Sequence, residues 1–207
     1  MSKEDRLKWI YSSKDNEELA ERYDQWAESY DQELEEDYGW QIPQLMAEEL
    51  SHLTPRSGRI LDAGAGTGLV GRYLGALGYG DLVAMDLSNE MLNKAREKGV
   101  YGEFHQMDLA ETLNFPDNSF DAVVCAGVLT FSHAPAKSLN ELVRVTKPGG
   151  HLLYSLRTDA YESMGFEDIT RALDADGKWK LLEKKGHQSF AQKEQEVVHD
   201  IWVYQVL

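Results

Sequence analysis

The sequence predicts an α/β domain in which helices cover both faces of a doubly wound, mostly parallel, seven-stranded sheet, with additional N-terminal helices. Two observations lead to this prediction. From residue 59 onward, short apolar runs of strand length alternate with segments of helical periodicity, which is typical of strand–helix–strand units. The last two strand-like runs are joined without a helical segment, so the last strand is expected to be antiparallel.

The first 54 residues are expected to form a helical cap, and residues 55–207 the core of a single domain. Residues 15–36 lack Pro and Gly and predict an amphipathic helix. A second helix is expected over Ile42–Leu53, with Pro43 in its first turn and Pro55 beyond its end. The first of these helices carries apolar side chains at three- and four-residue steps: Leu19, Tyr23, Trp26, Tyr30 and Leu34.

The elements of the core alternate along the chain. Ser88 is suited to cap the helix that runs to Lys98, with Glu90 in its first turn. The sequence Pro148-Gly-Gly predicts a turn. Helices are expected over residues 69–77, 88–98, 136–146 and 159–174. Strands are expected over residues 59–62, 81–85, 102–107, 120–125, 151–156, 179–185 and 201–207.

Length and charge limit the possible partners. A chain of 207 residues suits one α/β domain with a helical extension. The formal net charge of −15 disfavours nucleic acid and anionic membranes, because binding to both depends on Lys and Arg. A neutral or cationic small molecule suits this charge better. The acidic stretch Glu17–Asp37 is interpreted as a solvated helix face rather than an interaction tail, since Tyr and Trp are interleaved in it.

Cysteine content and hydropathy indicate the compartment. Cys125 is the only cysteine, so no internal disulfide can form. Residues 1–13 are charged and lack the apolar core of a secretory signal, and no stretch approaches the roughly 20 apolar residues of a membrane span. A cytoplasmic protein is therefore expected.

The most informative segment joins the first strand of the core to its first helix and reads Asp62-Ala-Gly-Ala-Gly-Thr-Gly68. Glycine permits a positive φ and a close approach of a ligand to the backbone. The carboxyl end of this strand is also the usual ligand crevice of an open parallel sheet. Alone, the loop is weak evidence, since a tight turn that binds nothing has the same composition.

A second landmark is Asp86, which ends the next strand. A carboxylate there is placed to accept hydrogen bonds from both hydroxyls of a ribose, although it could also act as a helix cap or a solvated acid. Together with the glycine loop, it favours a nucleoside-like ligand. A dinucleotide fits poorly, because the pattern G-x-G-x-x-G/A requires a small residue where this chain has Leu69.

Five segments in register identify the class of nucleoside ligand. They are LDAGAGTG at 61–68, MDLS at 85–88 with MLNKA after it, QMDL at 106–109, FDAVVC at 120–125 and RVTKPGGHLL at 144–153. In order and spacing they resemble the class I, Rossmann-like S-adenosylmethionine-dependent methyltransferases, whose seventh strand is antiparallel. Residues 23–31 and 127–135 further resemble the small methyltransferases of the Williams–Beuren region type, a likeness that supplies no substrate.

The resemblance implies S-adenosylmethionine as the cofactor and S-adenosylhomocysteine as its product. It also implies a role in cofactor binding for several residues of these segments. Asp62 would help to hold the cofactor amino group, and Asp86 would bind the ribose. Asp108 and the backbone amide of Leu109 would bind the adenine. The implied cofactor-binding residues are Tyr23, Tyr30, Asp62, Gly64, Ala65, Gly66, Gly68, Asp86, Leu87, Met91, Asp108, Leu109 and Cys125.

The remaining candidates concern the transfer itself. His133 is the best candidate for a general base, although a purely structural role before Pro135 is favoured over it. Arg157 and Tyr161, after the fifth core strand, are weaker candidates for contacts with the acceptor. Cys125 is interpreted as a small buried residue beside the cofactor sulfur, not as a nucleophile. No Asn-Pro-Pro-Tyr motif of amino-nitrogen methylation is present, and no metal site is expected.

These observations predict a methyltransferase that acts on a small molecule. A protein-substrate methyltransferase and a non-catalytic module that binds the cofactor or a partner protein are the alternatives. A nicotinamide-dependent oxidoreductase is a further alternative, against which Leu69 argues. The acceptor, the methylated atom and the oligomeric state are left open by the sequence.

Overall fold

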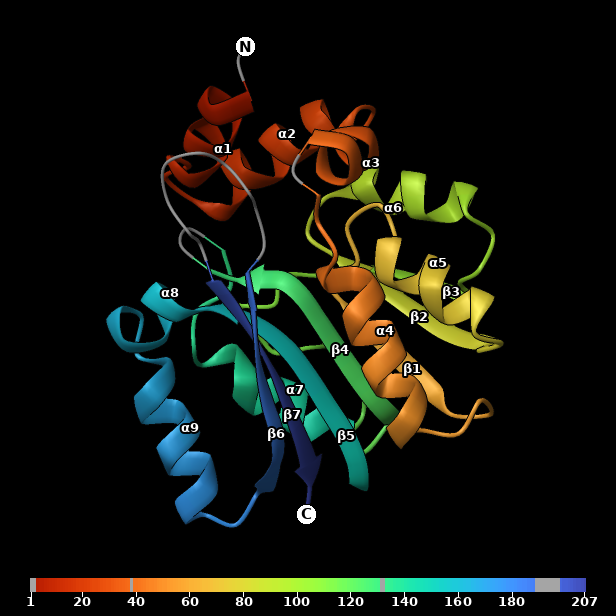
Figure 1. The fold of residues 1–207 in the computed structure, drawn as a ribbon, viewed down its shortest axis with the longest axis vertical. Coiled ribbons are helices and arrows are strands. Elements are labelled where there is room, and N and C mark those ends of the chain that lie inside the picture. Colours follow the sequence, from red (N-terminus) through yellow and green to blue (C-terminus); the bar gives the residue numbers. More distant parts are fainter. Residues whose placement is uncertain (1–2, 38, 131–132, 189–197) are drawn as a thin grey trace.

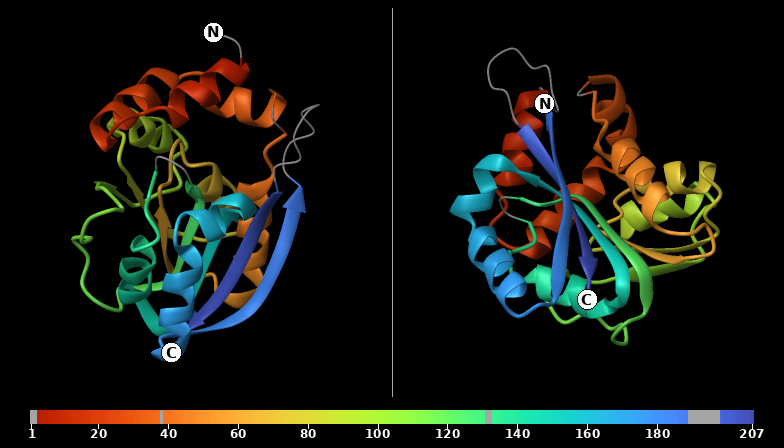
Figure 2. Two further views of the ribbon diagram at one scale, coloured as in Figure 1. Left: turned by 90° about the vertical axis from the view of Figure 1, so that its left-hand side faces the viewer. Right: turned by 60° about the horizontal axis from the view of Figure 1, so that its bottom comes forward.

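The structure is a computed structural model that describes residues 3–37, 39–130, 133–188 and 198–207. A seven-stranded sheet lies between two layers of helices, and a group of short helices covers one end of it (Figures 1 and 2). The strands are β1 Arg59–Ala63, β2 Asp81–Asp86, β3 Glu103–Gln106, β4 Phe120–Leu129, β5 Thr146–Arg157, β6 Trp179–Gln188 and β7 Val198–Val206. The helices are α1 Lys3–Tyr11, α2 Asn16–Trp26, α3 Tyr30–Gln32, the π-helix η1 Glu33–Asp37, α4 Ile42–Leu53, α5 Leu69–Ala76, α6 Asn89–Glu97, α7 Ser138–Val145, α8 Thr158–Ser163 and α9 Phe166–Ala175.

The sheet has the predicted topology. Its strand order is β3-β2-β1-β4-β5-β7-β6, and the first five strands in this order pair in parallel. Strand β7 is antiparallel to both β5 and β6. The strand order therefore reverses direction next to β1, and the carboxyl ends of β1, β2 and β4 form the crevice in which ligands of such sheets bind.

Two apolar clusters hold the helices against the sheet. On one face, α7, α8 and α9 bury residues such as Leu139, Leu142 and Phe166 against β4, β5 and β7. On the other face, α4, α5 and α6 pack through residues that include Met46 and Leu74. Because each strand alternates its side chains between the two faces, neighbouring residues contribute to different clusters.

The cap, formed by α1, α2, α3 and η1, has an apolar cluster of its own. Trp26 is 2% exposed and packs with Ile10, Leu19 and Leu34. The same cluster includes Leu69 from the first turn of α5. The residue that departs from the dinucleotide pattern therefore attaches the cap to the core. Among the helices of the described residues, none is long and apolar enough to cross a membrane.

Local capping follows the sequence closely. Ser88 caps α6 by accepting a hydrogen bond from the amide of Met91 at 3.0 Å, and Pro43 lies in the first turn of α4. The expected helix over 15–36 is wrong in its continuity, because α2 ends at Trp26 and the chain turns before α3. The expected helix over 159–174 is likewise divided into α8 and α9 at Gly165, whose φ is +76°.

Two further differences concern β5 and the N-terminus. The predicted turn Pro148-Gly-Gly lies within β5 as an irregularity, where Phe120 pairs with Thr146 but Ala122 pairs with His151. Strand β5 therefore begins five residues before the predicted strand. Helix α1 was not predicted, because its nine residues carry charges all round and show little apolar periodicity.

Candidate functional site

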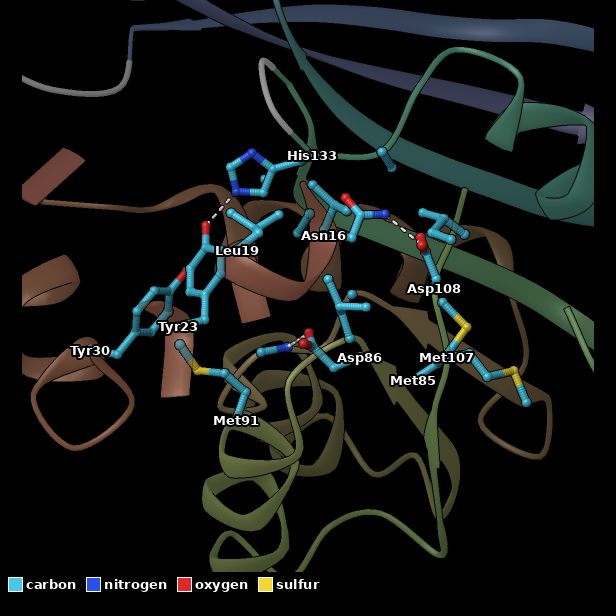
Figure 3. Close-up of a pocket in the computed structure, with 18 residues that line it drawn as sticks. Asn16, Leu19, Tyr23, Tyr30, Met85, Asp86, Met91, Met107, Asp108 and His133 are labelled. Carbon is cyan, nitrogen blue, oxygen red and sulfur yellow. Dashed lines mark hydrogen bonds between the residues drawn. The ribbon is translucent and has the colours of Figure 1, made fainter. Parts of the chain in front are cut away.

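A cavity lies at the carboxyl ends of β1, β2, β3 and β4, beneath the cap (Figure 3). It comprises about 690 Å³ of space, including the part open to solvent. A smaller cavity adjoins it behind the glycine loop and shares Tyr30, Gly64, Gly66 and Ala126 with it. The cap and the core thus enclose a two-part site.

The glycine loop lies between the two cavities and lines both of them. Gly64, Gly66 and Gly68 have φ values of +78°, +54° and +87°, a backbone region that residues other than glycine rarely adopt. A Cβ atom on Gly64 would lie 2.2 Å from Cγ2 of Val128. The amides of Gly64 and Ala65 both donate to the carbonyl of Met85, at 2.7 and 2.9 Å. The loop is therefore fixed against β2, with its backbone close to the cavity.

Asp86 connects the glycine loop to the end of β2. Its Oδ2 accepts from the amide of Gly66 at 2.7 Å, and its Oδ1 accepts from the amide of Ser88 at 2.9 Å. Burial raises the pKa of this carboxyl group, while the hydrogen bonds from the backbone oppose the shift. Each oxygen retains a second lone pair for a ligand hydroxyl, so the geometry fits a ribose.

Asp108 occupies the equivalent place after β3. Its Oδ1 accepts from the amide of Ala110 at 2.7 Å, and its Oδ2 accepts from the side-chain amide of Asn16 at 2.5 Å. Asn16 is the first residue of α2, so this hydrogen bond connects the cap directly to the predicted adenine side (Figure 3). Asn16 has no signal of its own in the sequence, because its partner lies 92 residues away.

Asp62 lies behind the glycine loop and does not line the cavity. Its side chain is 2% exposed, and its Oδ2 accepts from the hydroxyl of Tyr101 at 2.6 Å. That hydroxyl accepts from the amide of Gly71 at 3.0 Å. Oδ1 is buried and has no hydrogen-bond partner among the described residues. Burial raises the pKa of Asp62 to about 7, since the charged form is poorly solvated there.

The cap side of the cavity is aromatic. The hydroxyl of Tyr23 lies 2.6 Å from Nε2 of His133, and the two rings meet edge to face (Figure 3). Tyr23 also stacks on Trp26 and contacts Tyr30. Burial raises the pKa of Tyr23 and of Tyr30, so both phenols stay protonated. Trp26 itself does not line the cavity and instead donates from Nε1 to Glu33 at 3.0 Å.

Acidic residues of the cap attach it to the core. Asp31 accepts from Lys98 Nζ at 2.7 Å and contacts the hydroxyl of Thr67 in the glycine loop. Glu35 pairs with Arg72. The interpretation of Glu17–Asp37 as a solvated face is therefore wrong for Asp31, which is half-buried against the core, whereas Glu35 is exposed.

The structure brings most of the predicted site residues together. Ten of them line the main cavity: Tyr23, Tyr30, Gly64, Gly66, Asp86, Leu87, Met91, Asp108, Leu109 and His133. Ala65 lines the smaller cavity, and Gly68 precedes α5. Cys125 is fully buried in β4 and lines neither cavity, and burial raises the pKa of its thiol.

The weaker candidates lie outside the cavity lining. Arg157 makes two hydrogen bonds to Asp159, at 2.9 and 2.7 Å, and its guanidinium lies over the ring of Tyr11. Tyr161 stacks on Trp202 on the α8 side of the sheet. No group of His, Cys, Asp and Glu suited to a metal ion occurs among the described residues.

Eight lining residues were not assigned to the site from the sequence: Asn16, Leu19, Met85, Met107, Ala126, Gly127, Val128 and Ala134. Some of them had a usable signal. Met85 immediately precedes Asp86, which ends β2, and Met107 immediately precedes Asp108, which follows β3. Gly127, with a φ of +74°, lies in the carboxyl-terminal part of β4. A glycine at that place indicates an irregular backbone beside the crevice.

Comparison with known proteins identifies the family. Residues 61–154 match the family model described as a methyltransferase domain. The human methyltransferase-like protein 27 is 35% identical over 156 residues, which cover 73% of this chain and 63% of that protein. The ubiquinone/menaquinone biosynthesis C-methyltransferase UbiE of Vibrio cholerae is 41% identical over 102 residues, 46% of this chain and 39% of that protein.

A solved structure shares the fold. It is the methyltransferase in complex with the Haloferax volcanii Trm112 methyltransferase activator, with a TM-score of 0.66 and 19% identity, covering 89% of this chain and 97% of that one. The seven-stranded sheet with its antiparallel strand β7 agrees with this shared fold. Residues 61–154 therefore form the domain of a class I, S-adenosylmethionine-dependent methyltransferase, and the chain spans less than two thirds of the length of these curated relatives.

Proposed function

We propose that this chain transfers the methyl group of S-adenosylmethionine to a small molecule. The observation that carries the proposal is the position of Asp86. Its carboxylate is held by the glycine loop at 2.7 Å and faces the cavity that the cap covers. In this arrangement a carboxylate suited to a ribose lies next to the backbone of the glycine loop. Alignment of two bound reactants accounts for much of the rate in transfers of this kind.

The residues present fit the cofactor in shape and in charge. Two carboxyl groups, Asp86 and Asp108, line the main cavity, and no Lys or Arg occurs among its described lining residues. This distribution suits a ligand that carries a sulfonium and an ammonium group. The buried Oδ1 of Asp62 has no hydrogen-bond partner among the described residues, which suits a cationic amine reached directly or through water.

Each half of the cofactor then has its own set of residues. Asp86 would accept from the ribose hydroxyls, with Leu87 and Met91 along one face of the adenine. Asp108 and the amide of Leu109 would bind the adenine edge. The glycine loop, Asp62 and Tyr30 would hold the methionine part. When bound, the cofactor supplies an activated methyl group; the electrons of the broken carbon–sulfur bond stay on sulfur, and the acceptor loses a proton.

The cap favours a small acceptor over a protein. Tyr23 and Tyr30 lie over the cavity, and Asn16 and Asp31 attach the cap on two sides. A cavity partly covered in this way limits the access of water to the reaction and leaves little room for a polypeptide. The similarity to UbiE, which by its name methylates a small molecule at carbon, supports the same class of acceptor.

The proposal is tested with S-adenosylmethionine labelled in its methyl group. The purified protein is incubated with a cell extract divided into small molecules and protein. We expect label in an extractable small-molecule fraction. Label in protein alone would indicate a protein substrate, and cofactor binding without transfer to either fraction would identify a non-catalytic module.

A further inference from the structure

The two sides of the cavity differ in chemistry. The core side carries the carboxyl groups of Asp86, which accepts from two backbone amides, and of Asp108, which accepts from one backbone amide and from Asn16. The opposite side, formed by the cap and the end of β4, is uncharged or aromatic, and it includes Leu19, Tyr23 and Val128. Because the core side is assigned to the adenosyl group, we assign the opposite side to the acceptor and call it the acceptor side.

Among the described residues of the acceptor side, the hydroxyl of Tyr23 and Nε2 of His133 are in direct contact at 2.6 Å (Figure 3). In the tautomer in which Nε2 carries no proton, the hydroxyl of Tyr23, which burial keeps protonated, donates to Nε2. Tyr11 meets the ring of His133 edge to face at 5.8 Å. The imidazole is therefore held in one orientation by two aromatic neighbours.

The surroundings do not suit an acidic acceptor. The described lining residues of both cavities include no Lys or Arg. A guanidinium lies beyond the Tyr11 ring, that of Arg157, and it makes two hydrogen bonds with Asp159. A carboxylate or phosphate would therefore be buried next to two carboxyl groups without a cation, which is strongly unfavourable.

We infer that the acceptor is an uncharged aromatic molecule with a hydroxyl group, bound against the ring of Tyr23 and hydrogen-bonded to the Tyr23–His133 pair. This inference rests on the proposed function. As the acceptor oxygen gains the methyl group, its proton passes to the oxygen of Tyr23, and the former proton of Tyr23 passes to Nε2 of His133. The pair ends as a neutral phenol beside an imidazolium, so no proton is lost or gained.

The relay gives a role to the contact between a tyrosine and a histidine in a wall that carries no charged side chain among its described residues. A phenolic hydroxyl is a weak nucleophile until its proton is removed, and positioned proton transfer contributes about 10²–10⁴-fold to such reactions. The aromatic rings of the cap offer stacking surfaces for a second ring, with favourable centroid separations of about 4.5–7 Å.

The test uses the protein saturated with S-adenosylhomocysteine and two probes of similar shape, 4-nitrophenol and 4-nitrobenzoate. We expect 4-nitrophenol to bind about tenfold or more tightly than 4-nitrobenzoate, as measured by calorimetry. We also expect the absorbance of bound 4-nitrophenol to shift toward that of the phenolate, because the Tyr23–His133 pair takes up its proton. This spectral shift reports on the pair without any turnover.

The variant His133→Phe retains a ring for the contacts with Tyr11 and Tyr23 but removes Nε2. It is expected to lose the spectral shift and to bind 4-nitrophenol about tenfold more weakly, while its affinity for S-adenosylhomocysteine changes less than about twofold. His52→Phe, the same change at an exposed position in α4, is the matched control and should change neither property. If His133→Phe fails to fold, Tyr23→Phe removes the other half of the pair.

The outcomes separate the two proposals. If S-adenosylhomocysteine binds but 4-nitrobenzoate binds as well as 4-nitrophenol, the inferred acceptor class is wrong. A spectral shift that persists in both His133→Phe and Tyr23→Phe would overturn the relay. If S-adenosylhomocysteine itself does not bind to the unaltered chain, the proposed function fails, and the acceptor inference fails with it.

Discussion

Replacing Asp86 by alanine removes a carboxylate that serves the ligand and the glycine loop at once. In the structure, its two oxygens accept from the amides of Gly66 and Ser88, at 2.7 and 2.9 Å. With the ribose bound, the same oxygens would accept from its hydroxyls. Hydrogen bonds to a charged group contribute about 1.5–3 kcal/mol each, and water replaces part of what is lost in an open cavity. We therefore expect affinity to fall by about 1–3 kcal/mol, or roughly 5- to 150-fold.

The same substitution is expected to lower the free energy of unfolding. The amides of Gly66 and Ser88 lose a charged acceptor, which costs about 1–3 kcal/mol where water cannot replace it. The burial that raises the pKa of Asp86 offsets part of this cost, because removing the carboxyl group also removes its desolvation. Denaturant unfolding measures this effect separately from binding.

Asp121→Ala is the matched control. Asp121 also accepts from a backbone amide, that of Arg59 at 2.9 Å, and from Lys147 at 2.7 Å, but it lies at the opposite ends of the strands. This variant should lose stability without changing affinity for S-adenosylhomocysteine by more than about twofold. The account of Asp86 is refuted if calorimetry gives the same affinity for Asp86→Ala as for the unaltered chain.

Four further predictions concern the buried network and the cap. Tyr101→Phe should lower the free energy of unfolding by about 1–3 kcal/mol, because Asp62 and the amide of Gly71 lose their shared partner; unchanged urea unfolding would contradict this. Gly71→Ala should be destabilising by about 1–3 kcal/mol or more, since its Cβ would lie 2.1 Å from Cζ of Tyr101; a thermal midpoint equal to that of the unaltered chain would show that the ring can move away. Because burial raises the pKa of Asp62 to about 7, the folded state retains a proton that the unfolded state has released, so stability should fall as pH rises from the usual carboxyl range to about 7. The variant Asp62→Asn should remove that part of the pH dependence, and an identical pH profile would refute the assignment. Asp31→Asn, which weakens the contact with Lys98, should increase proteolysis of the cap at low salt, and added salt should reduce the difference from the unaltered chain.

The sheet and the cap of helix α6 were predictable because their sequence signals are local. Ser88 lies directly before an apolar-periodic segment, and the amide that it caps is three residues away. The glycine loop and Asp86 follow strands whose apolar runs are evident in the sequence, so the sheet topology places them together. The antiparallel last strand was predicted because the sequence between the last two strand-like runs has no helical periodicity, and the pairing of β6 with β7 confirms it.

The unpredicted features depend on contacts between distant segments. Tyr101 lies 39 residues from Asp62, and Asn16 lies 92 residues from Asp108, so neither partner has a local pattern. The break after Trp26 has no Gly or Pro to indicate it. It turns residues such as Asp31 toward the glycine loop, and that tertiary contact outweighs the helical propensity of the segment.

The central claim is that the cavity binds an adenosyl group through the glycine loop and Asp86. Calorimetric titration with S-adenosylhomocysteine and, separately, with NAD tests it most directly. We predict that S-adenosylhomocysteine binds at one site and that NAD does not bind, because Leu69 holds the cap where a dinucleotide pattern requires a small residue. Binding of NAD without binding of S-adenosylhomocysteine would contradict the account.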